Sequence, residues 1–150
     1  MNVNCTLVII RYTLILQLCI LRLEKYIIGI DQSTQGTKAL LLDAQGGLLC
    51  RRDVAHRQII SDAGWVSHDP IEIWHSTQEA VRRLLDISGI DAGQIVALGI
   101  SNQRETSVCW DKTSGMPIAN AIVWQCGRAK ELCQRVIDAG WSEQVRKATG

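Results

Sequence analysis

The polar segment Asp31–Lys38 carries the residue types that phosphate chemistry requires. A carboxylate such as Asp31 at the end of a strand can bind Mg²⁺ or its water ligands, because Mg²⁺ takes one or two carboxylates together with phosphate oxygens. Gly36 allows the chain to turn so that backbone N–H groups converge on an anion. Hydroxyl donors and a positive charge for a phosphate come from Thr34, Thr37 and Lys38. The segment is typical of a phosphate-binding turn; the alternative is an ordinary hairpin whose polar side chains bind their own backbone.

A second polar segment, Asn102–Glu105, follows a run of apolar residues. Arg104 beside Glu105 offers adjacent donors and acceptors, which is what neighbouring hydroxyls of a polyol need. The alternative is a solvated ion pair on a loop, which contributes little to stability. Trp124 follows another apolar stretch, Ala121–Val123, and its indole could pack on the C–H face of a polyol or lie in the core.

The elements that position the first segment are predicted to be three antiparallel strands in a meander, at residues 26–31, 38–43 and 48–56. A helix follows. Asp69 is a good N-cap, Pro70 is suited to the first helical position, and Gly89 marks the end. We expect an apolar stripe along this helix, made of Ile71, Trp74, Gln78, Val81 and Leu85, with Gln78 as its one polar member.

The second segment is preceded by residues 95–100, a continuous aliphatic run that predicts a strand buried on both faces. A shorter strand is expected at 107–110, a helix at 128–139 and a short helix at 142–148. The order β-β-β-α-β-β-α predicts a mixed α/β sheet with flanking helices. Such sheets bind ligands beyond the carboxyl ends of their central strands, where both polar segments are expected.

Composition excludes several classes of protein. The chain has 150 residues, enough for one ordinary domain, and its formal net charge of +1 argues against a nucleic-acid binder held by a basic surface. A hydrophobic fraction of 47% excludes a disordered or collagen-like chain. The six cysteines form no C-x-x-C pair and no zinc spacing, so we expect reduced thiols in a cytoplasmic protein.

Residues 1–25 form an atypical hydrophobic leader. Only Arg11 and Arg22 are charged between Cys5 and Leu23, but the uncharged run Tyr12–Leu21 is shorter than the roughly 20 residues that a membrane span needs. The first residues also lack the positive charge of a signal peptide. We therefore expect an extra segment or an upstream start codon, and no membrane anchor.

Four segments in sequence make residues 26–150 similar to the N-terminal part of the FGGY carbohydrate kinases, and within them to the glycerol kinases. They are YIIGIDQSTQGTKA (26–39), GWVSHDPIEIW (64–74), LGISNQRET (98–106) and AIVWQCGRA (121–129). The resemblance implies an actin-like, ribonuclease-H-like fold, of which this chain would be a partial first domain of a two-domain kinase. It also implies ATP and Mg²⁺ as cofactors.

The resemblance also implies roles for individual residues. Asp31 would lie near the Mg²⁺–ATP phosphates, with water between it and the metal. The rest of the phosphate- and nucleotide-binding turn would be Gln32, Thr34, Gln35, Gly36, Thr37 and Lys38. The ligands of the substrate hydroxyls would be Arg104 and Glu105, with Trp124 as an aromatic wall beside them.

The sequence departs from the glycerol kinases at two places. Those enzymes usually carry Gly-Thr-Thr-Ser-Ser-Arg where this chain has Ser33–Lys38, and Gly127 stands where an Arg is common. The substrate is therefore expected to be glycerol or a related polyol or sugar.

The general base and the adenine pocket of the family lie further along the chain than Gly150, so we expect the 150-residue chain to be inactive alone. The alternatives are a non-catalytic actin-like fragment or binding module, which could bind a polyol or a partner chain, and a membrane-tethered protein. A homo-oligomer is compatible with the sequence.

Overall fold

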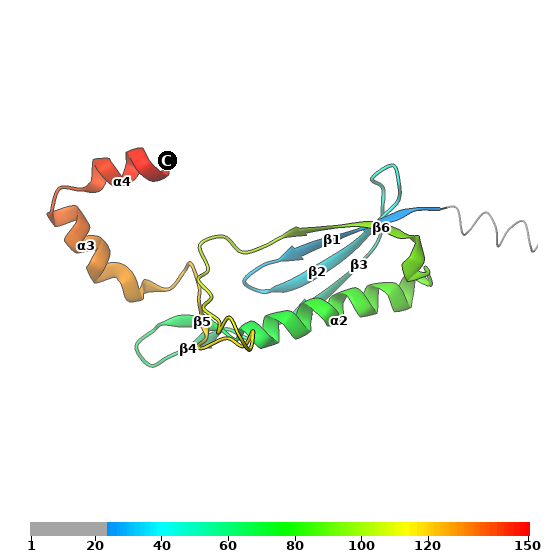
Figure 1. Cartoon of the computed structure of the whole chain (residues 1–150), viewed down its shortest axis with the longest axis horizontal. Helices are drawn as coiled ribbons and strands as arrows, with labels where there is room; N and C mark the ends of the chain where they lie inside the picture. Colours follow the sequence, from blue (N-terminus) through cyan, green and yellow to red (C-terminus); the bar gives the residue numbers. More distant parts are fainter. Residues whose placement is uncertain (1–23) are drawn as a thin grey trace, which may run out of the picture. The chain divides into compact units, whose positions relative to one another are not determined.

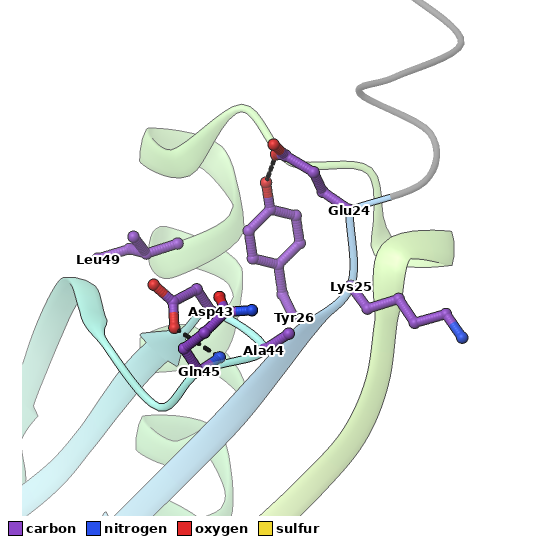
Figure 2. Close-up of a pocket in the computed structure, with 7 residues that line it drawn as sticks. All are labelled: Glu24, Lys25, Tyr26, Asp43, Ala44, Gln45 and Leu49. Atoms are coloured by element: carbon purple, nitrogen blue, oxygen red, sulfur yellow. Dashed lines mark hydrogen bonds between the residues drawn. The ribbon is translucent and has the colours of Figure 1, made fainter.

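The computed structural model describes residues 24–150 (Figure 1). The predicted hydrophobic leader, residues 1–25, therefore lies outside the described part except for Glu24 and Lys25. The chain divides into two units that are considered separately. The first joins the described residues up to His56 with Trp74–Asn102, and the second joins Arg57–Ile73 with Gln103–Gly150.

The first unit is built on a four-stranded sheet with the order β3-β2-β1-β6. Its strands are β1 (Tyr26–Gln32), β2 (Gly36–Leu42), β3 (Leu48–Ala55) and β6 (Ile95–Ser101). The first three pair antiparallel, which confirms the predicted meander, and β6 pairs parallel to β1. A short 3₁₀ helix, η1 (Ala92–Gln94), leads into β6.

The core lies between this sheet and the helix α2 (Pro70–Ser88), which runs along one face (Figure 1). Alternate residues of β1 and β2 point into it, as the period of two along a strand requires. The buried members are Tyr26, Ile28, Ile30, Ala39 and Leu41 from the strands and Ala80 and Leu84 from the helix.

Helix α2 begins and ends as predicted, and the expected apolar stripe is correct in part, because Val81 and Leu85 pack against the core cluster. The backbone N–H of Ile71 donates to Asp69 Oδ1 at 2.8 Å, which satisfies one of the unpaired donors of the first turn. The fully buried residues of α2 are Ser76, Ala80 and Leu84. The expected stripe is wrong at Trp74, whose surface is 58% exposed in this chain. The small side chains of Ser76 and Ala80 allow the helix to lie close to the sheet. Because the helix face that contains them is the buried one, Trp74 lies outside that face and is exposed.

The prediction that β6 is buried on both faces is also wrong for this chain. Within residues 24–150, β6 pairs with β1 alone, and of the β6 residues only Ile95 packs against the core cluster. Leu98 and Ile100 are 52% and 63% exposed as a result. The aliphatic run identified the strand correctly, but it carries no information about how many neighbours the strand has.

The second unit contains a small antiparallel sheet with the order β4-β5-β7. Its strands are short: β4 (Ile59–Ile60), β5 (Val66–His68) and β7 (Ala121–Ile122). No strand forms at the expected residues 107–110, where Ser107 makes a single bridge to Ile122 and Trp110 one to Pro117. Two isolated bridges provide too few ladder hydrogen bonds for a strand.

The remaining elements of the second unit are η2 (Gly127–Ala129), α3 (Lys130–Asp138) and α4 (Ser142–Thr149). The helix expected at 128–139 therefore begins as a 3₁₀ turn, and the short final helix is confirmed. No helix within residues 24–150 has the length and apolar character to cross a membrane.

Candidate active site

The loop between β1 and β2 has fewer residues than predicted, because both strands extend into the polar segment. Asp31 pairs with Lys38 and Gln32 with Thr37 in the antiparallel register. The turn that remains is closed by Ser33, whose N–H and Oγ both donate to the carbonyl oxygen of Gly36, at 2.9 and 3.1 Å. Gln32 Nε2 donates to the carbonyl oxygen of Ser33 at 2.9 Å, so the side chains of Ser33 and Gln32 both bind the local backbone, as in an ordinary hairpin.

Gly36 is required by packing. A Cβ atom built on it would lie 2.5 Å from the carbonyl oxygen of Val54 and 2.9 Å from the Cα of Ala55, both on β3. Real Cβ atoms do not approach backbone atoms so closely, so the pairing of β2 with β3 at this point depends on the missing side chain. Gly36 was predicted to let the turn bind an anion. Its close approach to β3 involves Val54 and Ala55, which lie far from the turn along the chain, so the sequence of the turn could not predict it.

A cavity of about 190 Å³ lies beside this loop. It is lined by loop and β2 residues on one side and by β3 residues on the other: Ser33, Gln35, Gly36, Thr37, Lys38 and Asp53, with the backbone of Val54 and Ala55. The structure thus brings four of the predicted phosphate-binding residues to one cavity. Asp31, Gln32 and Thr34 are not among its lining residues.

Three of the predicted phosphate-binding residues, Asp31, Thr37 and Lys38, have side-chain partners within the first unit. Lys38 Nζ donates to Asp31 Oδ2 at 2.7 Å, across the β1–β2 pairing. Thr37 is fully buried and its Oγ1 lies 3.1 Å from Oγ1 of Thr77 on α2, which ties the loop to the helix. The Lys38 charge therefore already has a partner, while Asp31 keeps one carboxylate oxygen without a bond in the described residues.

The parallel pairing of β1 with β6 places Asp31 opposite Ser101. Since the carboxyl ends of parallel strands meet at one edge, Asp31 and Ser101 both lie at that edge of the sheet, and Asn102 follows Ser101 along the chain. This agrees with the expectation that both follow neighbouring strands.

Arg104 and Glu105 are exposed, and neither forms an ion pair within residues 24–150. The alternative of a solvated pair on a loop is therefore not what the structure contains. Glu105 has φ +54°, the one positive φ outside glycine in the described residues. A left-handed backbone is unfavourable for a residue with a side chain, and such conformations concentrate at functional sites.

A hydrogen bond between Gln103 and His68 of β5, called the brace below, connects this loop to the small sheet. Gln103 Nε2 lies 3.4 Å from Nδ1 of His68, which is fully buried, and Thr106 Oγ1 donates to Gln103 Oε1 at 2.9 Å. The sequence led to no prediction for His68 or for its contact with Gln103. The contact joins residues 35 positions apart, and no local pattern in the sequence announces it.

Trp124 is brought toward the same loop by backbone pairing. Ser107 and Ile122 exchange two hydrogen bonds of 2.9 Å in antiparallel register. Glu105 lies two residues before Ser107, and Trp124 two residues after Ile122, so both stand at the same end of the bridge. The Trp124 side chain is 59% exposed rather than in the core. The register thus places Glu105 and Trp124 toward the same end of this bridge, and their joint contact with a substrate stays a prediction.

Comparison with known proteins identifies the class. Residues 26–150 match the model for the FGGY family of carbohydrate kinases, N-terminal domain. A glycerol kinase of Thermotoga maritima, glycerol kinase 1, is 46% identical over 125 residues, which are 83% of this chain and 25% of that protein. The glycerol kinase of Haloquadratum walsbyi is 44% identical over 127 residues, 85% of this chain and 25% of its own length.

Solved structures agree. The crystal structure of Plasmodium falciparum glycerol kinase with ADP matches with a TM-score of 0.68 and 34% identity, over 75% of this chain and 22% of that chain. Gluconate kinase from Lactobacillus acidophilus matches with a TM-score of 0.73 and 27% identity, over 83% of this chain and 24% of that one.

The chain belongs to the FGGY family of carbohydrate kinases and contains the N-terminal domain match from residue 26. The expected actin-like α/β fold and the resemblance to glycerol kinases are confirmed. The chain spans about a quarter of the length of the curated relatives described above.

Proposed function

We propose that this chain is the N-terminal part of an enzyme that transfers the γ-phosphoryl group of ATP to a hydroxyl of glycerol or of a related polyol or sugar. The observation that carries the proposal is the exposed loop with Arg104 and Glu105. Their charged groups have no ion-pair partner within residues 24–150 and stand at the same end of the Ser107–Ile122 bridge as Trp124. Family membership supplies the reaction class.

The substrate residues suit a polyol in three ways. The Arg104 guanidinium donates to hydroxyl oxygens, and the Glu105 carboxylate accepts from hydroxyl hydrogens, so adjacent hydroxyls find both roles filled. The Trp124 ring offers a flat apolar surface to the C–H groups of the ligand. The brace from His68 to Gln103 fixes the loop, which lowers the entropy lost when a ligand is bound.

The loop between β1 and β2 suits the phosphates of ATP. Its cavity is lined by Ser33, Gln35, Gly36, Thr37 and Lys38, which include two hydroxyl residues and one cation. Asp31 has one carboxylate oxygen engaged by Lys38 and one left, which fits a magnesium ion held through a water ligand. Mg²⁺ bound there would neutralise phosphate charge. Thr34, Gln35 and the backbone of Gly36 would border the transferred group, and Gln32 would support the turn.

A chimera tests the proposal. Residues 26–150 of this chain would be joined to the part of Thermotoga maritima glycerol kinase 1 that follows its matched segment. We expect ATP- and Mg²⁺-dependent phosphorylation of glycerol or of a related polyol or sugar. Glu105→Gln should raise KM for the polyol at least about tenfold, because a charged hydrogen bond to the substrate is worth about 1.5–3 kcal/mol.

Glu131→Gln is the matched control, since Glu131 has no ion pair within residues 24–150 and lies on α3. A chimera that unfolds cooperatively yet phosphorylates none of these substrates contradicts the proposal. The 150-residue chain alone should show no phosphorylation, because a base or positioning carboxylate and an adenine pocket are also needed. Turnover by the isolated chain contradicts that part.

A further inference from the structure

Arg128, in η2, is a half-buried arginine of the second unit with no carboxylate partner within residues 24–150. Its Nε donates to Cys126 Sγ at 2.9 Å. Its Nη2 donates to Ser67 Oγ at 2.8 Å and to the carbonyl oxygen of Val66 at 3.3 Å. A guanidinium has five N–H donors. The two on Nη1 make no hydrogen bond in the described part of the chain.

The guanidinium is also held in one plane. Its Cζ lies 5.0 Å from the ring centroid of Trp65, a cation–π distance. Together with the three hydrogen bonds, this contact fixes the orientation of Nη1 before any ligand arrives. A fixed cation with two unused N–H donors on Nη1 can donate to the oxygens of an oxyanion.

A cavity of about 310 Å³ lies against this arginine, at the lower end of the roughly 300–1,000 Å³ range of small-molecule sites. Besides Arg128, its polar lining is Ser61, Ser67 and Asn120, and its apolar lining includes Ile59 and Trp65. No acidic residue lines it. Ser61 Oγ accepts from the backbone N–H of Trp65 at 3.2 Å, so its hydroxyl hydrogen remains to be donated.

We propose that this cavity binds a phosphate group, carried either by inorganic phosphate or by a small phosphate monoester. The Nη1 pair of Arg128 would take two phosphate oxygens, and the hydroxyl and amide donors of Ser61 and Asn120 the remaining ones. Ile59 and Trp65 would contact the organic part of an ester. The site is separate from the proposed reaction, because none of its lining residues belongs to the phosphate loop or to the Arg104, Glu105 and Trp124 group.

NMR on the 150-residue chain tests the site. Inorganic phosphate and glycerol 3-phosphate would be titrated separately at constant ionic strength, while the Trp65 Nε1–H and Arg128 Nε–H signals are followed. We expect saturable shifts of both signals. Arg128→Gln should weaken binding at least about tenfold, and Arg128→Lys should also weaken it, since an ammonium cannot keep the hydrogen bonds to Cys126 and Ser67 and still donate to a phosphate as the guanidinium does. Arg135→Gln on α3 is the control and should change affinity less than about twofold.

Two further variants complete the test. Cys126→Ser replaces the sulfur that accepts from Arg128 Nε, and this variant should bind phosphate at least as tightly as the natural chain. Asn120→Ala keeps the proposal testable if Arg128→Gln does not fold, and should weaken binding about threefold or more. Tighter binding of glycerol 3-phosphate identifies the ester as ligand, and equal affinities identify phosphate itself. Absence of saturable shifts, or unchanged affinity in the folded Arg128→Gln or Asn120→Ala variant, overturns the proposal.

Discussion

Lys38 and Asp31 face each other across the β1–β2 pairing, with Nζ of the lysine 2.7 Å from Oδ2 of the aspartate. Their side chains are 36% and 44% exposed, so water screens the pair and its contribution to stability is small. The pair instead brings a positive charge next to the carboxylate at the carboxyl end of β1. An anion approaching the loop then meets less repulsion from Asp31 than the carboxylate alone would exert.

Removing the lysine charge should therefore affect function more than folding. Lys38→Met is expected to lower the free energy of unfolding of the chain by less than about 1 kcal/mol, measured by urea denaturation. In the chimera it should lower kcat/KM for ATP at least about tenfold. Lys112→Met, in a turn without an ion pair in residues 24–150, is the control for both measurements. A stability loss above about 2 kcal/mol with unchanged kinetics contradicts this division.

Gly36→Ala should destabilise the first unit by about 1–3 kcal/mol, because its Cβ would overlap the β3 backbone at Val54. Gly99→Ala, in β6, provides the matched control: an added Cβ meets nothing within 4 Å. Thermal or urea unfolding of the two variants measures the difference. Equal stabilities would show that β3 yields to the added methyl and that the close approach is not required.

Strand β1, which contains Asp31, and helix α2, which begins at Pro70, were predicted correctly. Strand alternation, an N-cap and a turn all depend on residues that are near neighbours along the chain. The meander and α2 were correct for that reason. What failed depends on distant partners. Ile100 is exposed because β6 pairs with β1 alone among the described strands, and Gln103 is held by His68, which lies in another strand.

The candidate site divides in the same way. Residue type and spacing pointed to Arg104 and Glu105 as candidates. The positive φ of Glu105 could not be predicted from neighbouring residues, and neither could the Ser107–Ile122 bridge that places Glu105 and Trp124 toward the same end. The Arg128 cluster was missed because its partners Val66 and Ser67 lie about 60 residues away.

The backbone of Glu105 predicts a trade-off between stability and binding. Glu105→Gly should leave stability unchanged or raise it by up to about 1 kcal/mol, because glycine adopts φ +54° without steric cost. The same variant should lose polyol affinity, since the carboxylate acceptor is gone. Differential scanning calorimetry of the chain and KM of the chimera measure the two effects. A clear loss of stability would mean that the carboxylate holds the loop rather than a ligand.

Glu79 on α2 predicts a pH dependence. Hydrogen bonds from Arg82 and Arg83, at 2.6–2.9 Å, lower the pKa of its carboxyl from 4.5 to about 2. A lowered folded-state pKa contributes stability above the unfolded pKa, and that contribution is lost as pH falls from about 4.5 toward 2. Glu79→Gln should therefore have a lower Tm than the natural chain at pH 7, and the difference should shrink steadily at pH 4 and pH 3. A difference that is independent of pH, or equal in Glu131→Gln, contradicts this assignment.

Cys126 should be the thiol that responds to Arg128. Burial raises the pKa of this thiol, but hydrogen bonds from the Arg128 side chain and backbone and from the Val66 N–H outweigh burial, so its pKa lies below the ordinary value. Arg128→Gln removes the strongest of these hydrogen bonds, and we expect the Cys126 pKa to rise in that variant. Titration of the Cys126 Cβ resonance measures it, and Cys109, exposed in the same unit, serves as the reference thiol.

Phosphate adds a second test, because an anion on Nη1 competes for the same guanidinium charge. Saturating phosphate should raise the Cys126 pKa in the natural chain and leave it unchanged in Arg128→Gln. A thiol pKa that ignores both the substitution and the anion would show that the Arg128 charge is neutralised by something other than these groups.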